Sequence, residues 1–350
     1  MHVLITGHLG YVGPAVIARL KEAGHRVTGL DAGYFRDCAD TVARAVAPDT
    51  EITKDIRDVA ASDLRGIDAV VHLSGLSNDP LGQLDPALTA AINHAATIRL
   101  ANLARDNGVG RFVFASSCSM YGASGDAERP LDETAPLRPA SAYADSKAAC
   151  ERDLAPLSGS SLTPVFLRFA TAFGVSPRMR FDLVLANLTA WARTTGTVRV
   201  LSDGTPWRPL VHVADMALAI ACAIEAPVET VRGQAFNIGR PDNNVRVREI
   251  AEIVQRQVPV SRIEITGETG GDPRSYRVDF TRALTQLRGF EPRWTVAMGA
   301  EEIDRWLVER QVDTAHFQSR MFIRLKQLEH LMKSGALAAD LRFRQSQSRQ

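Results

Sequence analysis

One tyrosine and one lysine in this chain of 350 residues are spaced for general-base chemistry. Tyr143 and Lys147 are four positions apart, so a helix would place both side chains on one face. An unperturbed tyrosine has a pKa of about 10. A lysine ammonium beside it stabilises the phenolate and lowers this pKa, which makes Tyr143 the predicted general base.

A serine after a predicted strand supplies another reactive hydroxyl. The apolar run 111–115 is typical of a buried strand, and Ser117 is the second residue of the Ser-Ser-Cys-Ser run that follows it. Open parallel sheets bind ligands beyond the carboxyl ends of their strands. The hydroxyl of Ser117 is therefore predicted to hold the reacting oxygen, and Ser117, Tyr143 and Lys147 form the predicted catalytic set.

The first predicted strand runs into a glycine-rich turn that is typical of a dinucleotide site. Gly7 permits a tight turn, Gly10 lets the backbone approach a diphosphate, and Gly13 lets the next helix pack closely on the strand. The amino end of that helix offers unpaired N–H groups and partial positive charge to phosphates. Tyr11 and Val12, between these glycines, belong to the same predicted site.

The adenosine half of the cofactor is predicted to lie at the ends of the next strands. Asp31 follows the glycine turn by about 20 positions, where an acidic residue accepts hydrogen bonds from the adenosine ribose. Its carboxylate would repel a ribose 2′-phosphate, and no arginine follows it immediately, so NAD is preferred over NADP. Further predicted contacts are Asp55, Ile56, Leu73, Ser74 and Gly75.

Short apolar runs alternate with amphipathic stretches through the first half of the chain, which predicts a parallel sheet covered on both faces. The predicted strands are 2–6, 26–30, 51–54, 69–73, 111–115 and 164–169, and the predicted helices are 12–23, 86–107 and 142–157. After residue 173 the pattern loosens into helices at 181–193, 213–226 and 247–256 and strands at 198–201 and 235–238.

These patterns predict an α/β fold, a Rossmann-type doubly wound parallel sheet with a smaller C-terminal substrate-binding lobe. The predicted divisions are residues 1–175 for the cofactor domain with the catalytic residues, 176–312 mainly for the second lobe, and 313–350 for a helical tail. In the tail, one helix over 316–333 would align Phe317, Met321, Leu325, Leu328 and Met332, and it is expected to pack on the body or on a second subunit.

The composition excludes several classes of protein. The 41 Lys and Arg residues balance 40 Asp and Glu residues, which argues against a nucleic-acid partner. The four cysteines have neither a CxxC pair nor zinc-site spacing, so no metal is predicted. Neither a signal peptide nor an apolar run of about 18 residues occurs, so a cytoplasmic protein without a membrane contact is predicted.

Taken together, the motifs resemble the extended short-chain dehydrogenase/reductase family, particularly its NAD-dependent nucleotide-sugar epimerases and dehydratases. The similarity runs from Met1 to about Trp306, and it includes Asn93, the Leu-Arg-Phe run 167–169 and the run 208–215. It implies NAD as the cofactor, Asn93 as a further cofactor contact and a nucleotide-diphosphate sugar as the substrate. It also implies a homodimer through a four-helix bundle of the helices 86–107 and 142–157.

The resemblance places the nucleotide sugar in the second lobe. Asn187, Arg208 and Arg274 are the implied contacts to the nucleoside diphosphate, the last within the turn Asp272-Pro273-Arg274. The other predicted substrate contacts are Cys118 and Ser119 beside Ser117, and Arg178 and Arg180, which could reach sugar or phosphate.

The residues after Ser117 bear on the reaction. In the family's 4,6-dehydratases two acidic residues follow the catalytic hydroxyl residue, whereas Cys118 and Ser119 stand there in this chain. Because neither can replace a carboxylate, dehydration is disfavoured. The predicted function is 4-epimerisation through a transient 4-keto sugar with retained NAD, which needs Ser117, Tyr143 and Lys147.

Three alternatives remain open. A nucleotide-sugar dehydrogenase or 4-ketoreductase would share the catalytic set, although a reductase would more often use NADPH, which Asp31 opposes. A 3,5-epimerase would use Cys118 as a proton donor. A sensor that binds dinucleotide without turnover would share the fold, but the intact catalytic set argues against it.

Overall fold

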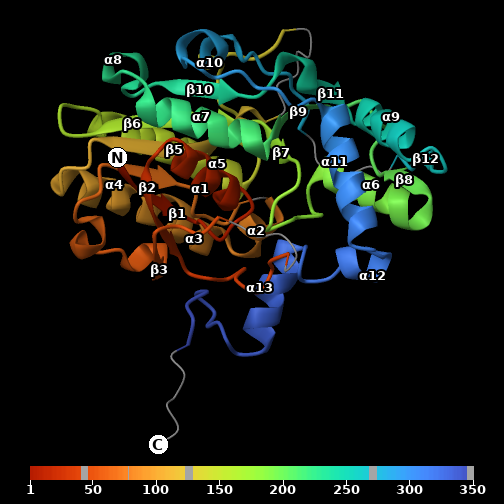
Figure 1. Cartoon of the computed structure of the whole chain (residues 1–350), viewed down its shortest axis with the longest axis horizontal. Coiled ribbons are helices and arrows are strands. Elements are labelled where there is room, and N and C mark those ends of the chain that lie inside the picture. Colours follow the sequence, from red (N-terminus) through yellow and green to blue (C-terminus); the bar gives the residue numbers. More distant parts are fainter. Residues whose placement is uncertain (41–45, 78, 123–128, 268–273, 345–350) are drawn as a thin grey trace, which may run out of the picture.

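The computed structural model describes residues 1–40, 46–77, 79–122, 129–267 and 274–344, and it is built around a seven-stranded parallel sheet (Figure 1). Its strands are β1 (His2–Thr6), β2 (Arg26–Asp31), β3 (Thr50–Thr53), β4 (Ala69–His72), β5 (Arg111–Ser117), β6 (Thr163–Phe169) and β10 (Ala235–Ile238). They lie in the order β10-β6-β5-β4-β1-β2-β3, so the chain reverses direction across the sheet between β1 and β4. The predicted doubly wound sheet is confirmed, and a reversal of this kind opens a crevice that can bind ligands.

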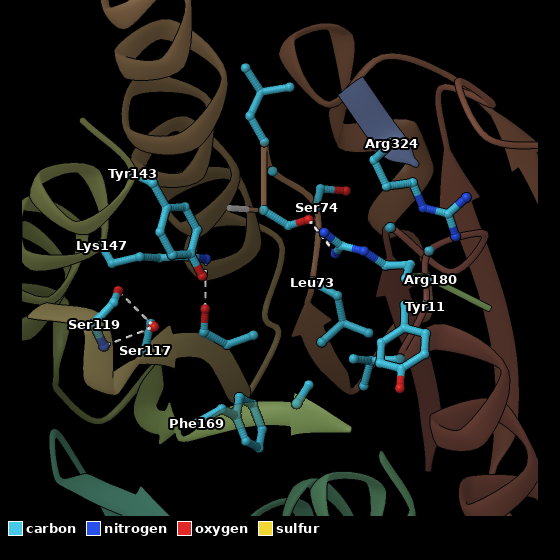
Figure 2. A pocket seen from close by; sticks show the side chains of 18 of the residues that line it. Tyr11, Leu73, Ser74, Ser117, Ser119, Tyr143, Lys147, Phe169, Arg180 and Arg324 are labelled. Carbon is cyan, nitrogen blue, oxygen red and sulfur yellow. Dashed lines mark hydrogen bonds between the residues drawn. The ribbon is translucent and has the colours of Figure 1, made fainter. Parts of the chain in front are cut away.

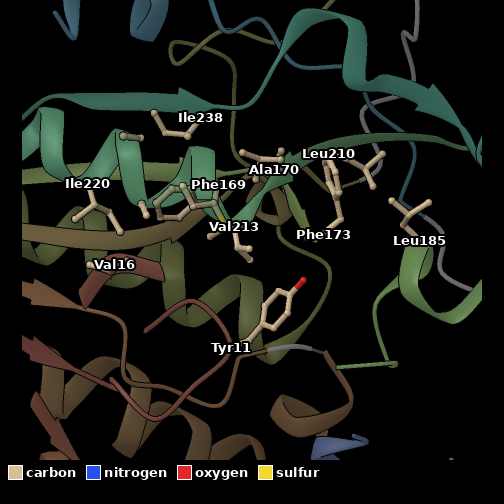
Figure 3. Close-up of a cluster of buried hydrophobic side chains, with 14 of the residues drawn as sticks. Tyr11, Val16, Phe169, Ala170, Phe173, Leu185, Leu210, Val213, Ile220 and Ile238 are labelled. Atoms are coloured by element: carbon tan, nitrogen blue, oxygen red, sulfur yellow. The ribbon is translucent and has the colours of Figure 1, made fainter. Parts of the chain in front are cut away.

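Two apolar layers cover this sheet, because successive residues of a strand point to opposite faces. Val3 and Ile5 join the layer that contains α1 (Gly13–Glu22) and α7 (Val213–Glu225), whereas Leu4 joins the layer of α4 (Ala96–Asp106) and α5 (Ala142–Leu154). Figure 3 shows part of the first layer, with Tyr11 of the glycine turn at its edge. The Tyr11 hydroxyl donates to the carbonyl of Gly174 at 2.5 Å, which ties the turn to the start of the second lobe.

Two elements differ from the sequence prediction. The predicted helix 86–107 is divided into α3 (Pro86–Thr89), a π-helical turn (Ala90–Ala95) and α4, which follows α2 (Asp79–Leu84). The strand predicted for the second lobe at 235–238 is β10, which pairs in parallel with β6 at the edge of the main sheet. The chain therefore returns to the cofactor domain after it has begun the second lobe.

The second lobe carries two small sheets beside the carboxyl edge of the main sheet. β7 (Thr171–Phe173), β9 (Trp207–His212) and β11 (Asn244–Arg246) form one, and β8 (Thr197–Val200) pairs with β12 (Arg262–Ile265) in the other. The helices of this lobe are α6 (Val184–Thr195), α9 (Val247–Gln257) and α11 (Val296–Glu309), whereas α8 (Val228–Val231) contacts β6 and α10 (Thr281–Gln286) contacts β10 of the main sheet.

The C-terminal segment, residues 313–344, folds back onto the body at the lower edge of Figure 1. The single helix predicted over 316–333 is wrong: α12 (Thr314–Phe317) and α13 (Arg324–Lys333) are separated by a turn. That turn buries Phe322, which lay off the predicted apolar face, with its ring centroid 5.3 Å from that of Phe181. Packing against the second lobe thus overrides the helical period of the sequence.

Several absences hold for the part of the chain that the structure describes. There, no helix has the length and apolarity to cross a membrane. Within those same residues, no group of three or more His, Cys, Asp or Glu side chains could hold a metal ion. All four cysteines are free thiols, and each is buried.

Candidate active site

A single cavity at the carboxyl edge of the sheet collects most of the predicted site residues (Figure 2). It extends from the glycine turn after β1, past the ends of β2 and β4, to the end of β5, and the second lobe closes it on one side. The predicted residues that line it are Gly7, Gly10, Tyr11, Val12, Gly13, Asp31, Asp55, Ile56, Leu73, Ser74, Gly75, Ser117, Ser119, Tyr143, Lys147, Arg180, Arg208 and Arg274.

The glycine turn forms a cradle that a side chain would fill. Gly7 has a φ of +76°, and a Cβ there would lie 2.7 Å from the backbone nitrogen of Ser74. A Cβ on Gly13 would collide with the backbone carbonyl of His8. The exposed backbone and the amino end of α1 therefore fit the diphosphate of a dinucleotide.

At the next strand end, the Asp31 carboxylate is fixed by two backbone donors. It accepts hydrogen bonds from the N–H groups of Leu9 at 3.1 Å and Gly33 at 2.7 Å. The first arginine after it, Arg36, pairs with Glu51 at 2.7 Å. The wall of the cavity thus presents a carboxylate here, which fits a ribose with free hydroxyls rather than a 2′-phosphate.

Asn93 does not line the cavity, so its predicted direct contact with the cofactor is corrected. Its Oδ1 accepts from the Leu76 N–H at 2.7 Å, and its Nδ2 donates to the Leu76 carbonyl and to the Ser146 hydroxyl, both at 3.1 Å. A Cβ on Gly75 would lie 3.0 Å from Oδ1 of Asn93. Asn93 therefore holds the loop after β4 against α5 from behind.

The catalytic set converges where β5 ends against the first turns of α5. Ser141 caps this helix, with its hydroxyl accepting from the Ala144 N–H, so Tyr143 lies in the first turn, where the helix dipole favours negative charge. The Ser117 hydroxyl lies on the side of Tyr143, whose pKa it lowers, and donates to the Ser119 hydroxyl at 2.8 Å. Lys147 donates to the carbonyl of Ala115 at 2.7 Å, and its Nζ lies 5.8 Å from the centroid of the Tyr143 ring.

The electrostatics of Tyr143 differ from the sequence prediction. Burial raises the pKa of Tyr143 above its ordinary value, and the hydrogen bond from Ser117 opposes this rise. Asp79 raises the pKa further, whereas the cations that lower it are Arg180 and Arg274. The expected net lowering of the Tyr143 pKa is thus wrong for the free protein, because desolvation of the phenolate outweighs the nearby positive charges.

Lys147 is buried at the cavity wall, and burial lowers its pKa to about 8. A lysine whose pKa is lower in the folded than in the unfolded chain destabilises the fold below about pH 8, and this cost disappears as the pH rises toward its unfolded pKa of about 10.5. We therefore expect Lys147→Met to stabilise the cofactor-free protein by roughly 1 to 3 kcal/mol at pH 7, and less at pH 9.5. Urea denaturation at both pH values measures this difference.

The matched control for that variant is Lys333→Met, because the Lys333 side chain is 81% exposed. This control should change the free energy of unfolding little and equally at both pH values. A Lys147→Met variant whose stability relative to wild type does not depend on pH would contradict the assignment of a buried ammonium.

Cys118 does not line the cavity, which corrects its prediction as a substrate contact. Its side chain is 1% exposed, and Sγ donates to the carbonyl of Arg168 at 3.1 Å. The 3-10 helix Cys118–Tyr121 turns the thiol into the protein while Ser117 and Ser119 face the cavity. Burial also raises the pKa of the Cys118 thiol, so the geometry disfavours its use as a proton donor in 3,5-epimerisation.

We expect Cys118→Ser to retain turnover within a few-fold of wild type, because the hydroxyl can donate to the same carbonyl. A steady-state assay with the nucleotide sugar, together with deuterium incorporation from solvent at C3 and C5, measures this. If Cys118→Ser lost both turnover and deuterium incorporation at C3 and C5, this result would favour 3,5-epimerisation with Cys118 as the proton donor.

The predicted arginine and amide contacts divide into two groups. Arg180 lies in the cavity wall, where it pairs with both oxygens of Asp182 at 2.9 Å and donates to the Ser77 hydroxyl at 3.1 Å. Arg274 pairs with Asp79 at 2.8 Å, and Arg208 donates to the carbonyl of Arg274. These three guanidinium groups line the cavity, where their charges can act on an anionic substrate.

Arg178 and Asn187 lie outside the cavity wall, so the structure does not bring these two predicted substrate contacts together with the others. Arg178 donates to the carbonyls of Phe35 at 2.7 Å and Arg36 at 2.6 Å, and thereby fixes the loop after β2. Asn187 donates to the carbonyl of Phe181 at 2.9 Å and so serves the start of α6. Asp272 and Pro273 of the predicted turn lie outside the described residues.

Other residues of the cavity wall escaped the sequence reasoning: Tyr34, Asp79, Asp182, Tyr276 and Arg324. Asp182 directly follows the Arg-Met-Arg-Phe run, so its pairing with Arg180 could have been suspected from their spacing. Arg324 carried no local signal, because it belongs to a helix that begins 50 residues after Arg274, the last of the predicted arginines of that wall.

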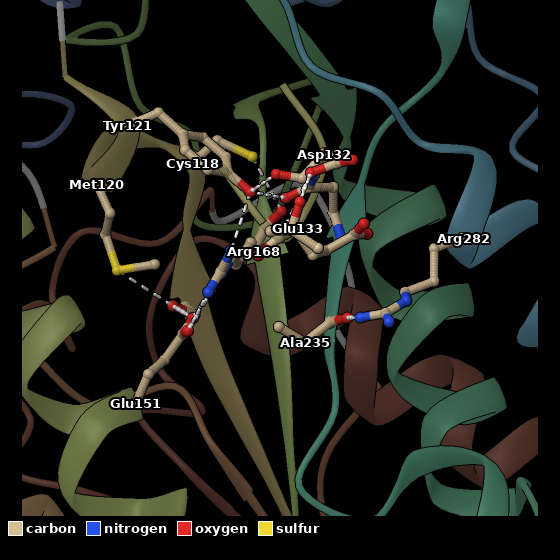
Figure 4. A network of polar contacts seen from close by, with 12 residues as sticks. Cys118, Met120, Tyr121, Asp132, Glu133, Glu151, Arg168, Ala235 and Arg282 are labelled. Carbon is tan, nitrogen blue, oxygen red and sulfur yellow. Dashed lines mark hydrogen bonds and ion pairs between the residues drawn. The ribbon is translucent and has the colours of Figure 1, made fainter. Parts of the chain in front are cut away.

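A buried polar network lies behind the catalytic set (Figure 4). Arg168 of β6 donates to both carboxylate oxygens of Glu151 on α5, with the shortest distance at 2.7 Å. The Ser116 hydroxyl donates to Glu151 at 2.5 Å, and Arg168 also donates to the Tyr121 hydroxyl at 3.0 Å. The Tyr121 hydroxyl in turn donates to Oδ1 of Asn237 at 2.7 Å. This network joins α5 to the ends of β5, β6 and β10.

This chain is similar in sequence to one family model and to known enzymes over most of its length. The model of a family described as the NAD dependent epimerase/dehydratase family matches residues 3–239. The UDP-glucose 4-epimerase of Mycolicibacterium smegmatis is 30% identical over 315 residues, which cover 85% of this chain and 96% of that enzyme. UDP-glucuronic acid decarboxylase 4 of Arabidopsis thaliana is 26% identical over 311 residues, which cover 85% of this chain and 67% of that protein.

The fold is also similar to solved structures. The structure of MoeE5 in complex with UDP-glucuronic acid and NAD superimposes with a TM-score of 0.74 at 27% sequence identity, covering 89% of this chain and 100% of that one. These relatives include epimerases and decarboxylases, so similarity alone leaves the reaction open.

Proposed function

The chain belongs to the NAD dependent epimerase/dehydratase family, and we propose that it is an NAD-dependent 4-epimerase of a nucleotide-diphosphate sugar. The observation that carries this proposal is that one cavity brings together the residues that the reaction needs. The hydroxyls of Ser117 and Tyr143 share it with the glycine turn and Asp31, while Cys118 and Ser119 stand where a dehydratase would carry acids.

In the proposed reaction the chain's own groups manage the proton of the C4 hydroxyl. The chemistry that NAD supplies when bound is reversible acceptance of a hydride. Tyr143 as the phenolate takes the C4 hydroxyl proton as the carbinol is oxidised and returns it when the ketone is reduced on its opposite face. Ser117 donates a hydrogen bond to the C4 oxygen and holds the ketone in place.

Positive charge around the Tyr143 hydroxyl favours its phenolate form. Arg180 and Arg274 already lower the pKa of Tyr143, and the Lys147 ammonium is held behind the ring by the carbonyl of Ala115. Once bound ligands exclude water, these charges act in a medium of lower dielectric constant and are therefore stronger.

The proposed substrate is a uridine diphosphate sugar. Arg208 and Arg274 come from the second lobe and can meet the diphosphate, to which arginine binds through paired N–H donors. The relatives named above act on or bind UDP-glucose or UDP-glucuronic acid, which makes these two compounds the first to test.

The test incubates the purified protein with UDP-glucose, UDP-galactose and UDP-glucuronic acid without added NAD, and follows the C4 configuration by NMR. We expect epimers to accumulate to equilibrium, with NAD released only when the protein is denatured. A requirement for stoichiometric NAD, or no turnover of any sugar, would contradict the proposal.

A decarboxylase is the second candidate, because Arg180 lies in the wall close enough for its charge to act on Tyr143. That guanidinium could hold a carboxylate on C6, and a 4-keto uronic acid loses carbon dioxide readily. The same NMR assay separates the two reactions, since UDP-glucuronic acid would give a pentose rather than the C4 epimer.

We also propose that the enzyme is a cytoplasmic homodimer that pairs α4 and α5 with the same helices of a second copy. Parts of both helices, such as Ile98 and Ala148, are only half-buried in the single chain. Sedimentation equilibrium would test the dimer, and a monomer at micromolar concentration would argue against it.

A further inference from the structure

Arg324 brings the C-terminal segment into the wall of the active-site cavity (Figure 2). It is the first residue of α13 and is 1% exposed. Its Nη2 donates to the carbonyl of Arg178 at 2.8 Å, and its guanidinium lies 4.7 Å from the centroid of the Phe35 ring. Phe35 also lines the cavity, four positions after Asp31, and the charge of Arg324 acts on Tyr11 of the glycine turn, so Arg324 lies between the adenosine end and that turn.

The other terminal nitrogen of Arg324 has no hydrogen-bond partner among the described residues. The remaining buried and unpartnered side-chain atoms there belong to His8, Arg111 and Arg277, none of which lines the cavity. A buried donor of a charged group that stays unpaired is costly. An unpaired donor at the wall of a ligand cavity therefore points to a partner on the ligand.

The charges around Arg324 specify an anionic partner. Burial and, next, the charge of Arg180 lower the pKa of Arg324 to about 10, so the group remains a cation at neutral pH. The nearby carboxylate of Asp182 already accepts from Nε and Nη2 of Arg180. Two guanidinium groups, those of Arg180 and Arg324, therefore act on one carboxylate here, that of Asp182.

We propose that Arg324 binds the diphosphate of NAD, so that the C-terminal segment supplies part of the cofactor site. This inference rests on the proposed function, which makes NAD the occupant of the cavity. The sugar nucleotide also carries a diphosphate, but Arg208 and Arg274 lie on the second lobe, whereas Arg324 lies over the loop that follows Asp31.

The C-terminal segment is positioned by contacts with the cofactor loops. The Tyr34 hydroxyl donates to the carbonyl of Leu341 at 2.7 Å, and Gln327 donates to the carbonyl of Tyr34 at 3.1 Å. Leu328 and Leu341 are fully buried. The family model ends at residue 239, and MoeE5 is matched over its whole length by 89% of this chain. The segment therefore adds a cofactor contact outside the part of the chain that defines the family.

The experiment compares the affinity of the NAD-stripped full chain for NAD and for adenosine by isothermal titration calorimetry. We expect Arg324→Met to weaken NAD binding by about 10- to 100-fold, the effect of one buried charged hydrogen bond. Adenosine, which lacks phosphate, should bind both proteins alike. Arg320→Met is the matched control, because Arg320 pairs with Gln327 in the same segment and does not line the cavity; it should leave NAD affinity unchanged.

Each outcome of these titrations either supports the inference about Arg324 or overturns it. Wild-type affinity for NAD in Arg324→Met would overturn the inference, as would an equal loss of NAD and adenosine binding, which reports a displaced segment instead of a lost phosphate contact. Weaker binding of UDP to the NAD-saturated variant, with NAD affinity intact, would assign Arg324 to the substrate diphosphate and also overturn it. If wild type itself binds no NAD, the proposed function fails instead.

Discussion

Replacing Tyr143 by phenylalanine is expected to lower turnover by roughly 100- to 10,000-fold, the usual contribution of a general acid–base group. The substitution removes only the hydroxyl that hydrogen-bonds to Ser117 and leaves the ring against α5. The glycine turn, Asp31 and the second-lobe arginines stay in place. NAD and UDP should therefore bind with nearly unchanged affinity, which calorimetry and the amount of released NAD would measure.

The pH dependence of the wild-type enzyme supplies an internal control. Because burial raises the pKa of Tyr143, kcat/KM should rise as the pH increases above neutrality, and the residual rate of Tyr143→Phe should lack this rise. A variant that keeps wild-type turnover, or that loses NAD in parallel with activity, would contradict the assignment of Tyr143 as the base.

Replacing Glu151 by glutamine is expected to destabilise the protein by about 3 to 5 kcal/mol, because it leaves the buried Arg168 charge without its counter-ion. Each side chain of this pair is only 8% exposed, and the Glu151 side chain also accepts from Ser116, next to the catalytic serine. Urea denaturation measures the loss. Turnover should fall as well, since the end of β5 loses a support.

Asp153→Asn is the matched control on the same helix. Asp153 forms an exposed pair with Arg152 at 2.7 Å and accepts from His94 at 2.8 Å, where water screens the charges. This substitution should change stability far less. If Glu151→Gln costs no more than Asp153→Asn, the buried network does not stabilise the fold as argued.

Local patterns in the sequence carried the prediction of the main sheet. The six strands predicted for its first half occur within two residues of their expected ends, because each is a short apolar run bounded by turn residues. The seventh strand, β10, has the same pattern but was assigned to the wrong lobe. A pattern of burial identifies a strand without identifying its neighbour, which depends on how α7 packs over β6.

The same contrast between local sequence patterns and tertiary contacts applies to the residues of the site. The glycines, Asp31, Ser117, Tyr143 and Lys147 were found because their chemistry depends on a spacing within one turn, one helix or one strand end. Asn93, Arg178 and Asn187 have suitable side chains at suitable places in the sequence, yet their nitrogens donate to backbone carbonyls of the protein. Which way a polar side chain turns is decided by partners that its own position does not reveal, six residues away for Asn187 and more than 140 for Arg178.

By itself, the sequence determined the class of fold, the dinucleotide turn and the types of catalytic group, since all of these depend on residues within a few positions of one another. Only the tertiary structure decided the burial of Cys118, the rise of the Tyr143 pKa and the entry of Arg324 into the cavity. These properties depend on desolvation and on charges from distant segments. Both arise only when the chain has folded and water has left the interior.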